Sequence, residues 1–186
     1  MKIQLSIIFF LVIFTSNSQS TSVEKSIYGI QTGVLGIWGY REVKLSRELA
    51  LREELGFDTG IFGGSFYPKT GYLIVPVLTL EPRWYYNLEK RHSNSKSIAG
   101  NSGNFLSLQT SFRPNWFSIS NYENIKIVNQ ISVIPTWGIR RNLGKHFNFE
   151  TGIGLGVRYY FAKNQGYINN VSKAAINLNL RVGYNF

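Results

Sequence analysis

The chain has 186 residues, no cysteine, a formal net charge of +10 and an aromatic content of 15%. This length suits one domain with a sizeable core, and the absence of cysteine excludes a fold held together by disulfides. The basic charge suggests nucleic acid or anionic lipid headgroups as partners, but the basic residues form no single run, and we expect no nucleic-acid partner.

Residues 1–18 are predicted to be a secretory signal peptide, with cleavage between about residues 18 and 20. Lys2 precedes the apolar run from Ile7 to Phe14, and small polar residues follow. This run is shorter than the about 20 apolar residues that a membrane-spanning helix needs. We therefore expect an exported protein in which residues 19–186 form one domain.

Seven later segments alternate between apolar and polar residues, and they start near residues 28, 48, 72, 104, 127, 146 and 174. In one of them the even positions from Tyr72 to Leu88 are apolar, whereas Glu81 and Arg83 are on the odd positions. Period-two alternation predicts strands with one apolar and one polar face. The segments exceed the about 5 or 6 residues of an ordinary strand and reach the about 9 to 11 that cross a bilayer.

Two of the segments are less regular. The stretch from Tyr28 to Val43 is rich in glycine, and its two faces are ambiguous. Between Leu49 and Ile61, Glu53 falls on the apolar face, which predicts a bulge or an exposed rim position. Because bacterial single-chain barrels have even strand numbers, we expect an eighth strand within residues 22–39 or 116–128.

The final segment, INLNLRVGYNF, has the cleanest alternation and ends on an aromatic residue. With the leader, the long strands and the aromatics at the strand ends, the chain resembles small outer-membrane β-barrel proteins of Gram-negative bacteria, in the porin-like group. In that group the last strand is recognised by the barrel-assembly machinery, and the matching positions here are Leu180, Val182, Tyr184 and Phe186.

The resemblance implies an all-β fold, a closed antiparallel up-and-down transmembrane β-barrel of about eight strands, located in the cell outer membrane. Its implied partners are outer-membrane lipids and, during biogenesis, the barrel-assembly machinery. The resemblance also places the long segment from Leu88 to Asn104 on the periplasmic side, where turns are normally short.

The polar faces carry charges that would share one narrow interior in an eight-stranded barrel. Unpaired buried charges cost several kcal/mol, so we expect a structural network that plugs the interior. Its predicted members are Arg52, Glu54, Asp58, Glu81, Arg83, Arg113, Arg140, Glu150, Arg158 and Arg181.

The sequence predicts no catalytic residue, no cofactor and no metal site, and the expected role is structural, adhesive or a minor passage for solutes. One alternative is a barrel enzyme acting on membrane lipid, similar to lipid A acylases or deacylases, which would use His92 with Ser93 or Ser95. His146 is the second histidine. Another alternative is a soluble periplasmic lipocalin-like binder with the two faces reversed, because alternation does not say which face points inward.

Overall fold

The structure, a computed structural model, describes residues 21–186 except 66, 67, 124 and 126. The predicted signal peptide lies outside the described residues. Within the described chain the fold is all-β, with nine strands in one sheet and every pairing antiparallel. The strands are β1 (Ser26–Gly33), β2 (Gly36–Lys44), β3 (Leu49–Phe62), β4 (Gly71–Trp84), β5 (Asn104–Arg113), β6 (Ile119–Ser120), β7 (Gln130–Leu143), β8 (Phe147–Tyr160) and β9 (Val171–Asn185).

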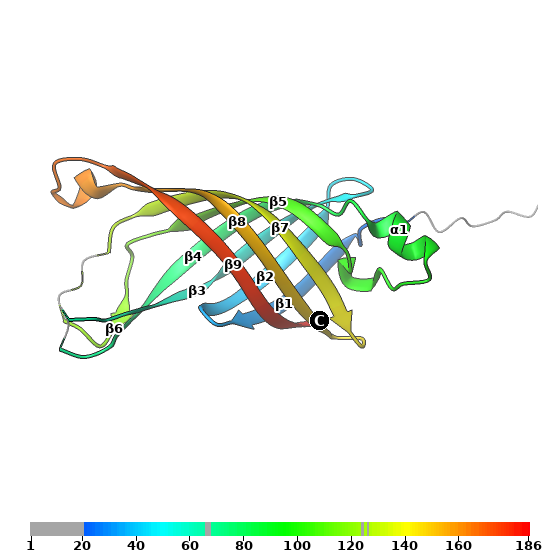
Figure 1. The fold of residues 1–186 in the computed structure, drawn as a ribbon, viewed down its shortest axis with the longest axis horizontal. Coiled ribbons are helices and arrows are strands. Elements are labelled where there is room, and N and C mark those ends of the chain that lie inside the picture. The colour runs from blue at the N-terminus through cyan, green and yellow to red at the C-terminus, as the bar shows by residue number, and fades with distance from the viewer. Residues whose placement is uncertain (1–20, 66–67, 124, 126) are drawn as a thin grey trace, which may run out of the picture.

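The sheet closes into a ring (Figure 1). Long strands pair with their neighbours in the order β1, β2, β3, β4, β5, β7, β8, β9, and β9 pairs back onto β1. The two-residue strand β6 pairs with β4 beyond the end of β5. The ring itself therefore has eight strands.

The glycine-rich segment from Tyr28 to Val43, expected as one strand, is two. β1 and β2 form a hairpin whose tip is Val34 and Leu35, with Gly33 and Gly36 paired on either side. The additional strand therefore lies within residues 22–39, and the other region considered, 116–128, contains only β6 among its described residues.

The pleat decides which side chains enter the ring. Along β4, Thr79, Glu81 and Arg83 are buried inside, whereas Leu80 and Trp84 are exposed outside. The same alternation on β8 and β9 leaves a continuous exposed apolar surface, formed by Ile153, Leu155, Val157, Ile176, Leu178, Leu180 and Val182. The polar faces thus point inward and the apolar faces outward.

Of the two alternatives predicted for Glu53, a bulge or an exposed rim position, the bulge is absent. The pairing of β3 with β2 and β4 runs through Glu53 without interruption, because its neighbours simply continue the alternation. Glu53 faces outward and lies 3.9 Å from Arg41, and the two side chains are 42% and 51% exposed. The charge that interrupts the apolar face of this segment in the sequence is therefore an exposed residue paired with Arg41.

One end of the ring, here called the α1 end, is closed by the connection between β4 and β5. That connection contains the helix α1 (Leu88–Ser93) and the 3-10 turn η1 (Ala99–Asn101), and β1 begins and β9 ends at the same end (Figure 1). At the opposite end, here called the β6 end, are β6 and the 3-10 turn η2 (Ala162–Gln165).

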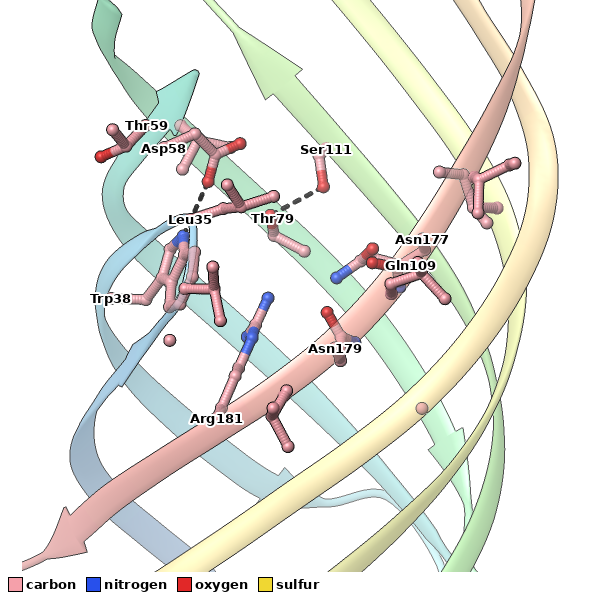
Figure 2. A pocket seen from close by; sticks show the side chains of 18 of the residues that line it. Leu35, Trp38, Asp58, Thr59, Thr79, Gln109, Ser111, Asn177, Asn179 and Arg181 are labelled. Atoms are coloured by element: carbon pink, nitrogen blue, oxygen red, sulfur yellow. Dashed lines mark hydrogen bonds between the residues drawn. The ribbon is translucent and has the colours of Figure 1, made fainter. Parts of the chain in front are cut away.

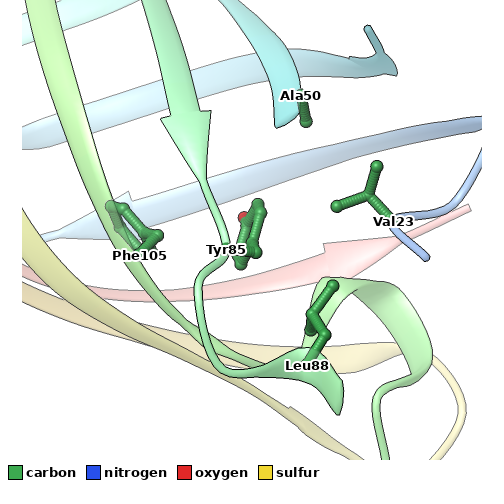
Figure 3. Close-up of a cluster of buried hydrophobic side chains, with 5 residues drawn as sticks. All are labelled: Val23, Ala50, Tyr85, Leu88 and Phe105. Atoms are coloured by element: carbon green, nitrogen blue, oxygen red, sulfur yellow. The ribbon is translucent and has the colours of Figure 1, made fainter. Parts of the chain in front are cut away.

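A small apolar core fills the ring at the α1 end (Figure 3). Its members are Val23, Ala50, Tyr85, Leu88 and Phe105, and all are buried. The Phe105 ring lies against Gly138, where an added Cβ would clash with the end of the ring. Glycine at this position therefore leaves room for the aromatic ring.

The wall of the ring is uneven because the β1–β2 hairpin is short (Figure 1). β1 pairs with β9 only from Gly29 to Gly33, opposite Asn185 to Arg181. Within the described chain, residues 171–180 of β9 therefore have no strand on that side. β2 likewise accompanies β3 only as far as Asp58. The gap between the hairpin tip and the β6 end, bounded by β3 on one side and residues 171–180 of β9 on the other, is called the wall notch.

Across the described residues, no helix has the length and apolar character needed to cross a membrane.

Candidate functional site in the interior of the ring

A buried ionic network occupies the half of the interior next to the α1 end. Four arginines and four glutamates form it. They lie on β2, β3, β4, β7, β8 and β9, and their side chains form ion pairs across the ring. The members are Arg52, Arg83, Arg140, Arg181, Glu42, Glu54, Glu81 and Glu150. The positive and negative charges are equal in number.

Glu150 is the most connected carboxylate of this network. Arg83 binds it through two parallel hydrogen bonds of 2.9 and 2.7 Å. Arg140 Nη1 donates to the same carboxylate at 3.3 Å, and Arg52 Nη1 lies 3.5 Å away. Two-point binding of this kind is stronger and more directional than a single contact, and Glu150 joins its own strand β8 to β3, β4 and β7.

Glu42 is the member that the sequence reasoning missed. Its carboxylate lies 3.6 to 3.8 Å from Arg52, Arg83 and Arg140, and it accepts hydrogen bonds from Asn101 and Tyr85. Its position in the sequence could have identified it, because Glu42 lies on the same face of β2 as Trp38 and Tyr40. All three residues are buried.

The Tyr85 hydroxyl donates to Glu42 at 2.9 Å, from the connection that closes the α1 end. Burial, followed by the charge of the Glu42 carboxylate, raises the pKa of the Tyr85 phenol. The phenol therefore remains protonated and keeps its donor proton, which links the apolar core to the ionic network.

Aromatic rings lie against all four buried guanidinium groups of the network. Arg52 and Arg140 lie 3.8 and 5.1 Å from the centre of the Tyr40 ring, Arg83 lies 4.3 Å from that of Phe105, and Arg181 lies 4.0 Å from that of Trp38. A desolvated cation gains about 2 kcal/mol from such a contact. The rings also occupy space that water would otherwise fill, which makes this half of the interior densely packed.

Of the ten residues predicted to form one network, three lie outside it. Asp58 and Arg113 pair with each other at 2.6 Å, and Trp38 Nε1 donates to Asp58 at 2.9 Å. Arg158 points inward near the β6 end, and within the described part of the chain it has no ion-pair partner. The remaining seven belong to the ionic network.

The four C-terminal positions, Leu180, Val182, Tyr184 and Phe186, are all exposed. The Phe186 ring packs edge-on against Tyr184, and 82% of Phe186 is exposed. The Phe186 amide donates to the Tyr28 carbonyl at 3.0 Å. The last residue thus adds to the outer surface at the α1 end and contributes nothing to the interior.

A cavity of about 910 Å³ occupies the half of the interior nearer the β6 end (Figure 2). Gln109, Asn177 and Asn179 line it, but so do apolar residues on the inward face. These are Leu73, Val75 and Val77 of β4 and Ile134 of β7. The sequence pattern marked the inward faces as polar, and this apolar patch was not predicted.

The two histidines do not form a catalytic arrangement. His92 is on α1, where the neighbouring Ser93 hydroxyl donates to the Lys90 carbonyl. His146 stacks on Tyr184 and contacts the Asn185 carbonyl at 3.2 Å. In the residues that the structure describes, neither imidazole has a serine or carboxylate partner, and no group of three His, Cys, Asp or Glu side chains could hold a metal ion.

Comparison with known proteins finds no matching family model, no matching curated protein and no matching solved structure.

Proposed function

We propose that the chain is a transmembrane β-barrel of the bacterial outer membrane, with an interior that is blocked and does not conduct. The observation that carries the proposal is the sidedness of the ring. The charges of the ionic network point inward and are paired, whereas the outer surface of β8 and β9 is apolar and exposed. In water such a surface is unfavourable, but a bilayer requires an apolar band on the outside of a closed ring of strands.

The blocked interior follows from the α1 end. Arg83, Arg140 and Glu150 are completely buried at the level of the ionic network, and the apolar core around Tyr85 and Phe105 lies beyond them. An ion passing along the axis would have to displace both layers. The role that fits is structural or adhesive, with the polar connections at the β6 end facing the outside of the cell.

The two alternatives gain no support from the geometry. A lipocalin-like binder keeps its apolar faces inside, which is the opposite arrangement to that of Leu178 and Leu180. A lipid-modifying enzyme would need a base paired with a nucleophile, and His92 lies on the capping helix with no such partner among the described residues.

Membrane location is tested by fractionating cells that express the protein and by gel electrophoresis with and without boiling. We expect the mature protein in the outer-membrane fraction, with a shift in mobility on heating that reports the intact barrel. Recovery of the mature protein in the periplasmic supernatant without detergent would refute the proposal.

Purified protein in a planar bilayer is expected to give no steady conductance, because the ionic network and the apolar core lie in series across the interior. An open porin recorded in the same bilayer serves as the positive control. Large, steady conductance steps from the purified protein would show that the interior is open.

Deleting Phe186 is expected to reduce the amount of protein in the outer membrane severalfold, while unaided folding into detergent micelles changes little. The reason is that Phe186 lies on the outer surface, away from the interior contacts, so its loss removes the assembly signal implied by the resemblance. Phe186→Tyr keeps a terminal aromatic residue and is the control. Normal membrane levels of the deletion variant would count against this role.

A further inference from the structure

The wall notch leaves the edge of one strand open. Residues 171–180 of β9 pair with β8 on one side, and no strand among the described residues pairs with them on the other. In a bilayer an open edge exposes unpaired backbone N–H and C=O groups, which is costly in a hydrocarbon environment. A closed barrel normally avoids this, so the notch points to a use for the opening.

The cavity reaches the outside through this notch. From β9, both the inward side chains Asn177 and Asn179 and the outward side chains Ile176 and Leu178 line the same cavity. The tip of the β1–β2 hairpin, Val34 and Leu35, lines the same cavity on the side nearer the α1 end. Residues on both sides of the notch, Thr59 and Gly60 of β3 and Leu178 of β9, thus line the cavity, and the cavity opens sideways between these two strands.

The part of the ring near the β6 end carries an excess of positive charge. Arg158 and Lys173 are directly opposite each other on β8 and β9, on the inward face. Like charges in this position destabilise a strand pair, and neither side chain makes an ion pair with another described residue. The ionic network is balanced in charge, whereas Arg158, which lines the cavity, and the exposed Lys173 beside it give the β6 end a positive potential that attracts an anion.

A second polar group points into the cavity without a partner. Asn179 is only 7% exposed, and its Nδ2 donates no hydrogen bond within the described chain; Figure 2 shows its side chain directed toward the cavity. The buried Arg158 Nε is likewise unpartnered. Buried donors are rarely left unsatisfied, and both therefore mark positions where a ligand can accept hydrogen bonds.

We propose that the wall notch admits one alkyl chain of an anionic amphiphile from the membrane into the cavity. The alkyl chain lies along the apolar patch formed by Leu73, Val75, Val77 and Ile134, and the anionic head group lies between Arg158 and Lys173. A volume of about 910 Å³ is within the range of about 300 to 1,000 Å³ of small-molecule sites. The inference rests on the proposed membrane location.

This orientation agrees with that of the surrounding lipid. The head group is near the β6 end, while the chain points toward the ionic network, just as a lipid of the adjacent leaflet holds its head outward and its tail toward the bilayer centre. A molecule could then slide sideways through the notch without turning over. A free fatty acid and an anionic phospholipid share this chemistry.

The test uses Trp38, which lines the cavity and is buried inside the ring. The variant Trp84→Phe, Trp116→Phe, Trp137→Phe leaves Trp38 as the fluorophore and is reconstituted in phosphatidylcholine vesicles. Dibromostearate is added in one arm, and phosphatidylglycerol with a brominated chain is included in the other. Bromine quenches tryptophan only on contact, so the arm that quenches Trp38 identifies the source of the chain.

We expect saturable quenching in at least one arm. Val77→Phe fills the cavity and should abolish the quenching, whereas Leu78→Phe, on the outer face of the same strand, should not. Arg158→Gln should weaken binding about tenfold, as expected for the loss of one charge-assisted contact. Arg141→Gln, an outward cation of β7, is its control.

The heat-dependent gel shift shows whether each variant is folded and inserted. If Val77→Phe does not fold, Ile134→Phe fills the same cavity from β7. Inserted protein whose Trp38 is quenched in neither arm overturns the inference and leaves the proposed function standing, whereas protein that fails to enter vesicles refutes the proposed function itself. A crosslinked dimer joined at β9, without quenching, would assign the open edge to a second copy and also overturn the inference.

Discussion

Replacing Glu150 by alanine is expected to lower the free energy of unfolding by about 3 to 5 kcal/mol, the cost of removing one partner from a buried ion pair. The reason is that Arg83 loses a two-point contact, and Arg52 and Arg140 lose a neighbouring negative charge. Since the network is balanced, the variant leaves an uncompensated positive charge in a dry interior. Urea unfolding of the protein in phospholipid vesicles, followed by tryptophan fluorescence, measures the change.

Glu89→Ala is the matched control for Glu150→Ala. It removes the same charge from an exposed position on α1, where a change within about 0.5 kcal/mol is expected. If both variants unfolded at the same urea concentration, the interior network would contribute no more than a surface charge does, and the assignment of a buried, mutually dependent network would be wrong.

Replacing Phe105 by alanine is expected to cost about 3 to 5 kcal/mol, as large-to-small substitutions of buried aromatic residues do. Phe105 is fully buried, packs against Tyr85 with ring centres 5.5 Å apart, and its ring centre lies 4.3 Å from the Arg83 guanidinium. Its removal leaves a cavity over Gly138 and takes away a cation–π partner. The same urea experiment measures this loss.

Leu106→Ala provides the comparison on the neighbouring residue of β5. Leu106 faces outward and is 45% exposed to the surroundings of the ring, so truncation there creates no interior cavity and should cost much less. Equal losses at positions 105 and 106 would mean that the apolar core at the α1 end does not contribute separately to stability.

Alternation alone was enough to predict most of the strands. β4, β8 and β9 fall where the sequence pattern places them, because each keeps one apolar and one polar face over its length. Ion pairs such as that between Arg83 and Glu150 could also be expected from the sequence, because charges confined to one interior must find partners. What alternation could not supply was the direction of the faces, which depends on how the sheet closes.

The β1–β2 hairpin escaped prediction because its tip is apolar. A two-residue hairpin is usually signalled by Asn-Gly or a similar pair, whereas Val34 and Leu35 resemble the strand residues on either side. The apolar patch escaped for another reason. The two-residue alternation identifies the face of β4 on which Val75 and Val77 lie. It does not show how far along the axis of the ring these residues are, and so it does not reveal that they line a cavity.

The closure of the ring between β1 and β9 has a consequence for the order of folding. Ile30 pairs with Tyr184, so the contact that completes the ring joins residues far apart in the chain. Contacts of this kind are slow to form because the intervening chain must first be ordered. Until this late step the two edge strands stand unpaired and can pair with other chains, which makes the interval before closure the period in which the nascent protein most needs a chaperone.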